Sequence, residues 1–157
     1  MRFLFYDRVT ELERGKRIVG VKTFALSEEF LRGHFDRRPV VPGTVLIEAM
    51  AQLLGWLVIA SHDFRLAAIL SLVDDVTIAD PLLRPGIAAT ITAELLSTSA
   101  SDSLGRARME VDGTPVASVE RVIYTHLPQT DSERLKDLFC YCSGLDRRTL
   151  AEGGAAR

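Results

Sequence analysis

Alternating apolar positions, many of them β-branched or aromatic, predict six β-strands in this chain. The first two are expected at Phe3–Thr10 and Arg17–Leu26, on either side of a turn at residues 13–16. The four later strands are expected at residues 67–73, 86–96, 104–111 and 115–126. Asp112-Gly113 is a hairpin signal between the last two, because glycine tolerates the positive φ of such turns.

One long helix is predicted over Thr44–Ser61, after Pro42-Gly43. Its apolar side chains point in every direction, and a helix that is apolar all round must be surrounded. In a chain of 157 residues, a curved antiparallel sheet can wrap around most of the helix, and a second copy of the chain can cover the rest. The pattern therefore predicts an α+β fold and a homodimer.

The chain turns polar after residue 128. A short helix is expected at Ser132–Phe139, and the final EGGAAR is expected to be disordered. We therefore expect a domain over residues 1–128 and a C-terminal extension over residues 129–157 that is partly helical and then disordered. Cys140 and Cys142 are one residue apart, a poor spacing for a disulfide or a structural zinc site, and are expected to be ordinary thiols.

Composition narrows the classes of function. Hydrophobic residues make up 47% and charged residues 25%, which is typical of a globular protein. A net charge of -2 gives no basic surface for nucleic acid. The N-terminus lacks the apolar length of a signal peptide, and no uncharged apolar run reaches the ~18 residues of a membrane span. The expectation is a cytoplasmic protein with no nucleic-acid or membrane partner.

Two polar side chains interrupt the apolar surface of the predicted helix. Glu48 and Gln52 are four residues apart and therefore lie on one face. A carboxylate is costly to bury unless it is paired, and burial favours the protonated form, which can donate a proton. Glu48 is therefore a candidate general acid.

The same helix begins at a second candidate. Backbone N–H groups at a helix start have no intrahelical partner, and Gly43 has no side chain to keep a ligand carbonyl away from them. Gly43 is therefore a candidate oxyanion site, roughly 7.5 Å along the axis from Glu48. In the preceding loop, which Pro39 and Pro42 stiffen, His34 can accept a proton near neutral pH. The three parts predict a base, an oxyanion donor and an acid.

The segment that holds these residues is GHFDRRPVVPGTVLIEAMAQ, residues 33–52. It resembles the signature GHFP-x-x-P-V-x-P-G-V-L-x-I-E-A-M-A-Q of the β-hydroxyacyl-acyl carrier protein dehydratases of bacterial fatty-acid synthesis, which have the hot-dog fold. FLFYDRVTELERGKRIVGVK resembles that family's first strands, and DPLLRPG resembles its R-P-V-x-P-G-D link. The resemblance covers residues 3–124.

The resemblance implies a curved antiparallel β-sheet wrapped around a long central α-helix. It also implies a homodimer, or a trimer of such dimers, with two active sites across each dimer interface. The substrate would be a (3R)-hydroxyacyl thioester on acyl carrier protein, and the product a trans-2-enoyl thioester. The acyl chain would lie in an apolar tunnel beside the helix, and no metal or other cofactor is implied.

A role for each site residue follows from the same resemblance. His34 of one protomer would remove the α-proton, the N–H of Gly43 would hold the enolate-like oxygen, and Glu48 of the other protomer would help the β-hydroxyl leave as water. The Val40 carbonyl would orient the imidazole, and Gln52 would steady Glu48. Glutamate at position 48, where the isomerising variant has aspartate, favours a plain dehydratase.

Departures from the pattern leave two alternatives open. Asp36 replaces the usual proline and places a carboxylate near His34, and Ile87 stands where the link usually has aspartate. One alternative is a hot-dog acyl thioesterase, which would release a free acid and a free thiol. The other is a non-catalytic partner that binds acyl carrier protein, although the presence of both His34 and Glu48 argues against it.

Charged and aromatic neighbours of the motif have simpler interpretations too. Arg37 and Arg38 are candidates for docking an acidic acyl carrier protein, the alternative being a solvated pair. Arg84 is expected to be a structural ion-pair partner. Phe35 and Trp56 are expected in the core.

Overall fold

The protein is described by a computed structural model, in which residues 4–35, 37–128 and 131–152 are described. The strands are β1 (Arg8–Glu13), β2 (Arg17–Phe24), β3 (Leu66–Ile78), β4 (Ile87–Thr98), β5 (Asp102–Val111) and β6 (Thr114–Pro128). The helices are α1 (Gly43–Ser61), α2 (Ser132–Ser143) and α3 (Arg147–Glu152), with a 3-10 turn, η1, at Glu29–Leu31.

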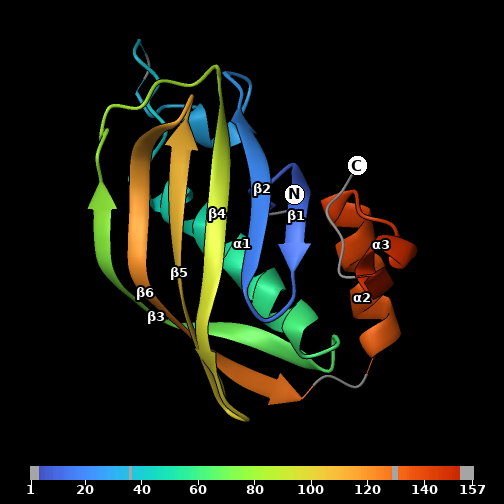
Figure 1. Cartoon of the computed structure of the whole chain (residues 1–157). Helices are drawn as coiled ribbons and strands as arrows, with labels where there is room; N and C mark the ends of the chain where they lie inside the picture. The colour runs from blue at the N-terminus through green and yellow to red at the C-terminus, as the bar shows by residue number, and fades with distance from the viewer. Residues whose placement is uncertain (1–3, 36, 129–130, 153–157) are drawn as a thin grey trace.

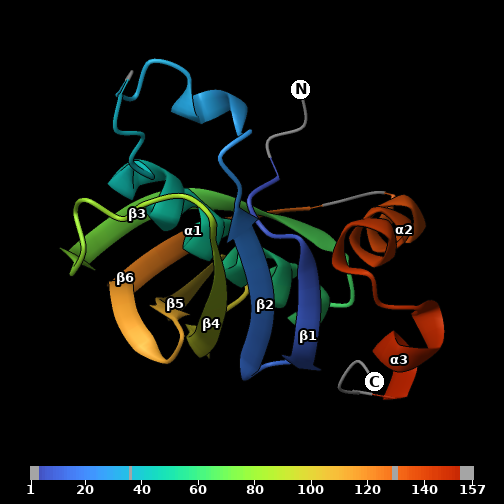
Figure 2. The ribbon, with the colours of Figure 1, turned by 90° about the horizontal axis from the view of Figure 1, so that it is seen from above.

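All six strands form one antiparallel sheet in the order β1-β2-β4-β5-β6-β3. Figures 1 and 2 show this sheet curling around α1, while α2 and α3 lie outside it beside β1. The predicted α+β arrangement, a curved antiparallel sheet around one long helix, is confirmed.

Close packing of α1 on the sheet depends on two strand glycines. A Cβ added to Gly20 of β2 would lie 3.1 Å from Leu53 Cδ1, and one added to Gly105 of β5 would lie 2.8 Å from Leu54 Cδ1. Because glycine has no side chain, these two strands leave room for the leucines of α1. Leu53 and Leu54 are fully buried as a result.

One stripe of α1 stays uncovered within a single chain. Ten of its residues are buried, but Glu48, Gln52, Trp56 and Ile59, spaced by three or four positions, are only half-buried. By length and composition α1 could also cross a membrane, yet 56% of its most apolar window is buried inside the protein. The core helix of a folded domain can have the same length and apolar composition as a membrane span. The high hydropathy of α1 is therefore explained by the sheet that surrounds it.

The two largest differences from the sequence prediction are in β3 and β1. β3 extends to Ile78, beyond the expected end at Val73, because its pairing with β6 continues past Asp74 to Ile78↔Ala117. Two consecutive aspartates hide that continuation in the sequence, and Asp75 has a positive φ of 55°. β1 begins at Arg8 rather than Phe3, and residues 4–7 lead into it as irregular chain.

β3 is an edge strand with apolar side chains open to solvent. Its only partner in the described sheet is β6. Its exposed large apolar residues are Ile69, Leu70, Leu72 and Val76. An exposed apolar edge is a ready pairing surface for another chain.

The C-terminal extension contains more helix than expected. α2 begins at Ser132 as predicted but continues to Ser143, where Gly144, with φ 73°, ends it in a left-handed conformation. α3 follows at Arg147–Glu152. Glu152, the first residue of the EGGAAR segment that was expected to be disordered, is the last residue of α3. The rest of that segment, 153–157, and the carboxylate that Asp36 was expected to place near His34 lie outside the described residues.

Candidate active site

Glu48 lies in the second turn of α1 and is held by a neighbour on the same face. Gln52 Nε2 donates a 2.8 Å hydrogen bond to Glu48 Oε1, and the Phe5 backbone N–H donates a 2.9 Å hydrogen bond to Gln52 Oε1. The expected contact between Glu48 and Gln52 is therefore present. The expected full burial of Glu48 is not observed within one chain, where this residue is half-buried.

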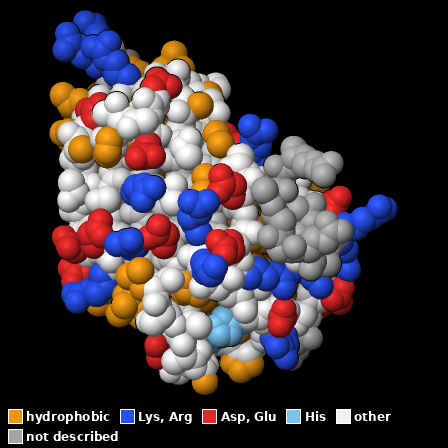
Figure 3. Space-filling view, viewed as in Figure 1, with side chains coloured by type: hydrophobic (Ala, Val, Ile, Leu, Met, Phe, Trp, Pro, Cys, Tyr) orange, Lys and Arg blue, Asp and Glu red, His pale blue; other side chains and the backbone are white. Residues whose placement is uncertain are grey.

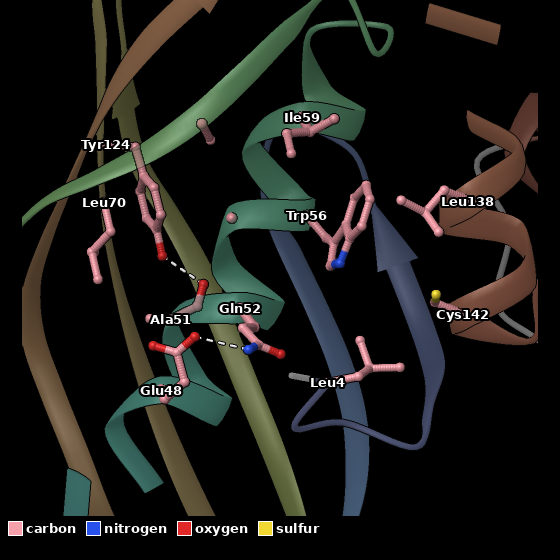
Figure 4. Close-up of a pocket in the computed structure, with 12 residues that line it drawn as sticks. Leu4, Glu48, Ala51, Gln52, Trp56, Ile59, Leu70, Tyr124, Leu138 and Cys142 are labelled. Atoms are coloured by element: carbon pink, nitrogen blue, oxygen red, sulfur yellow. Dashed lines mark hydrogen bonds between the residues drawn. The ribbon is translucent and has the colours of Figure 1, made fainter. Parts of the chain in front are cut away.

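A cavity of about 560 Å³ opens beside this carboxylate, and we call it the Glu48 cavity. Figure 4 shows it running over α1, with β3 and β6 on one side and α2 on the other. Its lining comprises Leu4, Glu48, Ala51, Gln52, Gly55, Trp56, Ile59, Ala68, Leu70, Tyr124, Leu138 and Cys142. Apart from the polar atoms near Glu48, this lining is apolar and suits an aliphatic chain.

Tyr124 of β6 is a lining residue that the sequence analysis missed. Its hydroxyl donates a 2.5 Å hydrogen bond to the Ala51 carbonyl, and Figure 4 shows it pointing to the turn of α1 that carries Glu48. Burial first, and the charge of Glu48 second, raise the pKa of Tyr124 well above its usual range. The phenol is therefore a neutral donor next to the carboxylate.

A glycine in the middle of α1 makes room for that ring. A Cβ on Gly55 would lie 3.4 Å from Tyr124 Cε1. Glycine inside a helix costs about 1 kcal/mol relative to alanine, so it usually marks a close approach. Gly55 was the one sequence signal that could have indicated a neighbour of this kind.

Trp56 was expected in the core, and it packs against the hydrophobic core without being fully buried. It is half-buried, lines the Glu48 cavity, and its ring lies 5.1 Å from that of Phe139 in α2. Figure 4 shows the indole directed toward Leu138 and Cys142. Nothing in the sequence indicates this contact, since α1 and α2 are far apart along the chain.

Gly43 lies at the first position of α1, as its proposed role requires. Pro42 is the N-cap and offers no side-chain cap, and its carbonyl accepts the N–H groups of Val45 and Leu46 at 2.9 and 3.3 Å. A Cβ at Gly43 would meet Ile78 at 3.4 Å, so this glycine leaves the helix start sterically open.

His34 lies in the loop between η1 and α1 and is anchored through its backbone. Its N–H donates to the Leu31 carbonyl, and its carbonyl accepts the Val40 N–H, each at 3.1 Å. The imidazole lies 4.7 Å from the Phe35 ring, and Nδ1 is buried without a hydrogen-bond partner among the described residues. The Val40 carbonyl therefore does not accept from Nδ1, contrary to the expectation for Val40.

Within one chain the described residues do not bring the acid and the base together. His34 does not line the Glu48 cavity. Gln52 and Glu48 form one group on α1, while His34 and Val40 form another in the loop before it.

A second hollow, of about 760 Å³, lies beside the same loop, and we call it the arginine groove. Its lining comprises Leu26, Phe35, Arg37, Arg38, Pro39, Val40, Leu82, Arg84 and Pro85. Figure 3 shows basic side chains projecting near hydrophobic ones at the end of the molecule where this loop lies in Figure 1. Phe35 is 60% exposed here and is not a core residue.

The three arginines of the groove have no carboxylate partners within the part of the chain that the structure describes. Among the described residues, Arg37, Arg38 and Arg84 form no ion pair. Arg84 is therefore not the structural ion-pair partner that we expected. Three free cations beside apolar side chains favour an acidic partner surface.

The described part of the chain contains no group of three or more His, Cys, Asp or Glu side chains that could hold a metal ion. Cys140 and Cys142 are half-buried free thiols there.

The fold and this site define a hot-dog protein with an acid on its central helix. A chain of a dehydratase heterocomplex from Xenorhabdus doucetiae has the same fold (TM-score 0.64, 16% identity, 87% of this chain and 90% of that one). So does a hypothetical thioesterase with coenzyme A from Streptococcus pneumoniae TIGR4 (TM-score 0.60, 13% identity, 78% and 90%). Identities this low show the fold alone.

The chain belongs to the FabA-like family, because the model of the FabA-like domain matches residues 1–120. It is 34% identical over 118 residues to the 3-hydroxyacyl-acyl-carrier-protein dehydratase FabZ of Caldicellulosiruptor bescii, covering 75% of this chain and 84% of that protein. The FabZ of Bacillus subtilis is also 34% identical, over 120 residues, with the same coverage. The predicted family is confirmed, and the matched domain ends before α2.

Proposed function

We propose that this protein dehydrates (3R)-hydroxyacyl thioesters carried by acyl carrier protein, giving trans-2-enoyl thioesters. The observation that carries this proposal is Glu48, held by Gln52 at one end of a largely apolar cavity in a chain of the FabA-like family. A carboxyl group and an alkyl-binding surface are both needed for a 3-hydroxyacyl substrate.

The proposed reaction uses the His34 imidazole, the Gly43 N–H and the Glu48 carboxyl group. His34 removes the C2 proton, and the electron pair moves toward the thioester carbonyl, whose oxygen accepts a hydrogen bond from the Gly43 N–H. The electrons then form the C2=C3 double bond as the C3–O bond breaks. Glu48 gives its proton to the departing hydroxyl, which leaves as water, and the proton on His34 returns to Glu48 before the next cycle.

The site is completed by two copies of the chain, with His34 of the partner subunit reaching Glu48. The uncovered stripe of α1 and the exposed edge of β3 support this homodimer. The position of His34 outside the Glu48 cavity of its own chain supports it too. Association of three dimers into a hexamer stays a prediction.

Carrier docking is proposed at the arginine groove. Arg37 and Arg38 were candidates from the sequence, and Arg84 joins them because it lines the same groove and has no carboxylate partner among the described residues. Leu26 and Leu82, 67% and 70% exposed, give that surface apolar contacts beside its charge. A basic surface with apolar contacts suits the acidic face of acyl carrier protein.

The test is to incubate the protein with 3-hydroxyacyl-acyl carrier protein and to identify the products. We expect the enoyl thioester, with the thiol still acylated. Free acid and free thiol would instead identify a thioesterase, and binding without turnover would identify a non-catalytic partner. His34→Ala and Glu48→Gln should each abolish turnover, while His62→Ala and Glu120→Gln should not.

Mixing the two inactive variants tests whether each site is shared between chains. If chains exchange freely, half the dimers are heterodimers with one intact site of two, so about a quarter of the wild-type activity should return. No recovery, with exchange verified by mass spectrometry, would argue against sites built from two subunits.

A further inference from the structure

The Glu48 cavity has a wall that lies outside the matched domain. The family model ends at residue 120, yet Leu138 and Cys142 of α2 line the cavity together with α1 residues. They are four positions apart and therefore lie on the same face of α2. This extension is thus part of the substrate cavity and not only an appendage.

α2 is held firmly enough to act as a wall. Phe139 is fully buried, and its ring lies 5.1 Å from Trp56 and 5.6 Å from Phe64. Leu145 and Leu150, beyond α2, are buried as well. Aromatic contacts at these distances stabilise beyond the area that they bury.

Polar contacts hold the N-terminal half of the helix. The Asp131 side chain caps α2 by accepting the Arg134 N–H at 3.0 Å. Arg147 bridges Glu133, at 2.7 Å, and Asp137 across the turn into α3. Because Leu138 and Cys142 belong to the same helix, these contacts help to keep both side chains beside α1.

The cavity changes from polar to apolar toward this wall. Glu48, Gln52 and the Tyr124 hydroxyl lie on one side, with Leu4 beside Gln52, whereas Trp56, Leu138 and Cys142 lie toward α2 (Figure 4). Trp56 follows Glu48 by eight residues, which is about 12 Å along the helix axis. A substrate whose reacting carbons are at Glu48 therefore points its alkyl tail toward α2.

We propose that α2 closes the alkyl end of the cavity and that Leu138 and Cys142, with Trp56, set the longest acyl chain that this protein accepts. The inference rests on the proposed dehydratase function, since it takes Glu48 as the reacting end.

Leu138→Ala and Leu138→Phe test the wall by changing its bulk in opposite directions. The ratio of kcat/KM for long over short 3-hydroxyacyl substrates should rise about tenfold with alanine and fall by a similar factor with phenylalanine. Leu96→Ala is the matched control, because Leu96 is 50% exposed against 45% for Leu138 and does not line the cavity. Dehydration by both Leu138 variants with the wild-type chain-length profile would overturn the inference.

Thiol labelling tests the same wall without turnover. In a Cys140→Ser variant, N-ethylmaleimide should modify Cys142 more slowly when a long saturated acyl-pantetheine is bound, but not when a short one is. Saturated acyl groups lack the 3-hydroxyl, so they cannot be dehydrated. In the control variant Cys142→Ser, labelling of Cys140 should not depend on acyl length.

The outcomes separate this inference from the proposed function. If protection of Cys142 depends on acyl length but no dehydration is detected, the role of α2 at the alkyl end of the cavity is supported and the proposed dehydratase function is contradicted. Dehydration together with equal Cys142 labelling at every chain length would contradict the wall.

Discussion

The Glu48 cavity and the arginine groove differ in how far one chain satisfies its own polar groups. In the cavity, Glu48 is bonded to Gln52, and Gln52 to the backbone of Phe5. In the groove, Arg37, Arg38 and Arg84 have no carboxylate partner among the described residues. The first surface is preorganised for a small substrate, whereas the second keeps its charges available for another macromolecule.

This difference predicts that substitutions in the two regions will have different effects on substrates joined to acyl carrier protein and on substrates joined to pantetheine alone. A change in the Glu48 cavity should affect every substrate, whether it is joined to acyl carrier protein or only to pantetheine. A change in the arginine groove should affect the protein-linked substrate alone.

The largest effect is expected for Glu48→Gln. The amide keeps the size of the side chain but cannot give a proton to the leaving hydroxyl, so kcat/KM should fall by about 10²–10⁴-fold for both kinds of substrate. Glu120→Gln, an exposed change on β6, is the control. An effect confined to the carrier-linked substrate would contradict the assignment of Glu48 to the chemical step.

The next effect is expected when Arg37, Arg38 and Arg84 are all changed to alanine. Loss of three cations that have no carboxylate partner in the described ranges should lower kcat/KM for carrier-linked substrates about tenfold or more, and added salt should lower wild-type activity toward them in the same way. Pantetheine-linked substrates should be turned over at the wild-type rate. Arg134→Ala with Arg148→Ala, at exposed arginines outside the groove, should change neither.

If the triple variant slows both kinds of substrate equally, the groove is part of the catalytic site and the comparison fails. Measuring both substrates at two salt concentrations separates that result from simple electrostatic steering.

A smaller effect is expected for Gln52→Leu. It removes the hydrogen bond to Glu48 Oε1 and leaves the Phe5 N–H without its acceptor. A bond worth about 1–2 kcal/mol corresponds to roughly tenfold in rate, so kcat should fall by that order while KM changes little. A rise in KM with an unchanged kcat would show that Gln52 acts in binding and not in positioning Glu48.

The fold could be predicted because its main signals are local. The apolar run of α1 and the alternation in β2, β4, β5 and β6 give those elements within a few residues. β3 was cut short because Asp74 and Asp75 interrupt its apolar pattern, while its register with β6 is set by tertiary pairing. Helix and strand signals come from neighbouring residues and can be recognised in the sequence, whereas strand pairing joins residues that are far apart in it.

The candidate site divides in the same way. The contact between Glu48 and Gln52 follows from helical spacing, which a sequence displays. Tyr124, Trp56 and Leu138 meet only after β6, α1 and α2 have packed, so no spacing rule indicates them. The expectation for the Val40 carbonyl came from resemblance alone, and in one chain Val40 offers its N–H instead.

The smallest effect is expected in the pH dependence of the free energy of unfolding, which tests how tightly the Glu48 cavity is packed. Tyr124 and Tyr6 are 3% and 1% exposed, and burial raises the pKa of both phenols well above the usual range. Below about pH 10 the folded and unfolded chains both keep these protons. Above it the unfolded chain loses them and the folded chain does not, so the free energy of unfolding should fall by about 1.4 kcal/mol per pH unit for each tyrosine.

Tyr124→Phe should remove one of these two contributions to the slope. At neutral pH it should cost only about 1 kcal/mol, for the lost hydrogen bond to the Ala51 carbonyl. Tyr141→Phe, at a side chain that is 77% exposed, is the matched control and should leave the slope unchanged. Urea unfolding followed between about pH 9 and 11 measures both quantities. An identical slope in wild type and Tyr124→Phe would mean that water reaches the phenol, and that the cavity beside Glu48 is looser than its packing against Gly55 indicates.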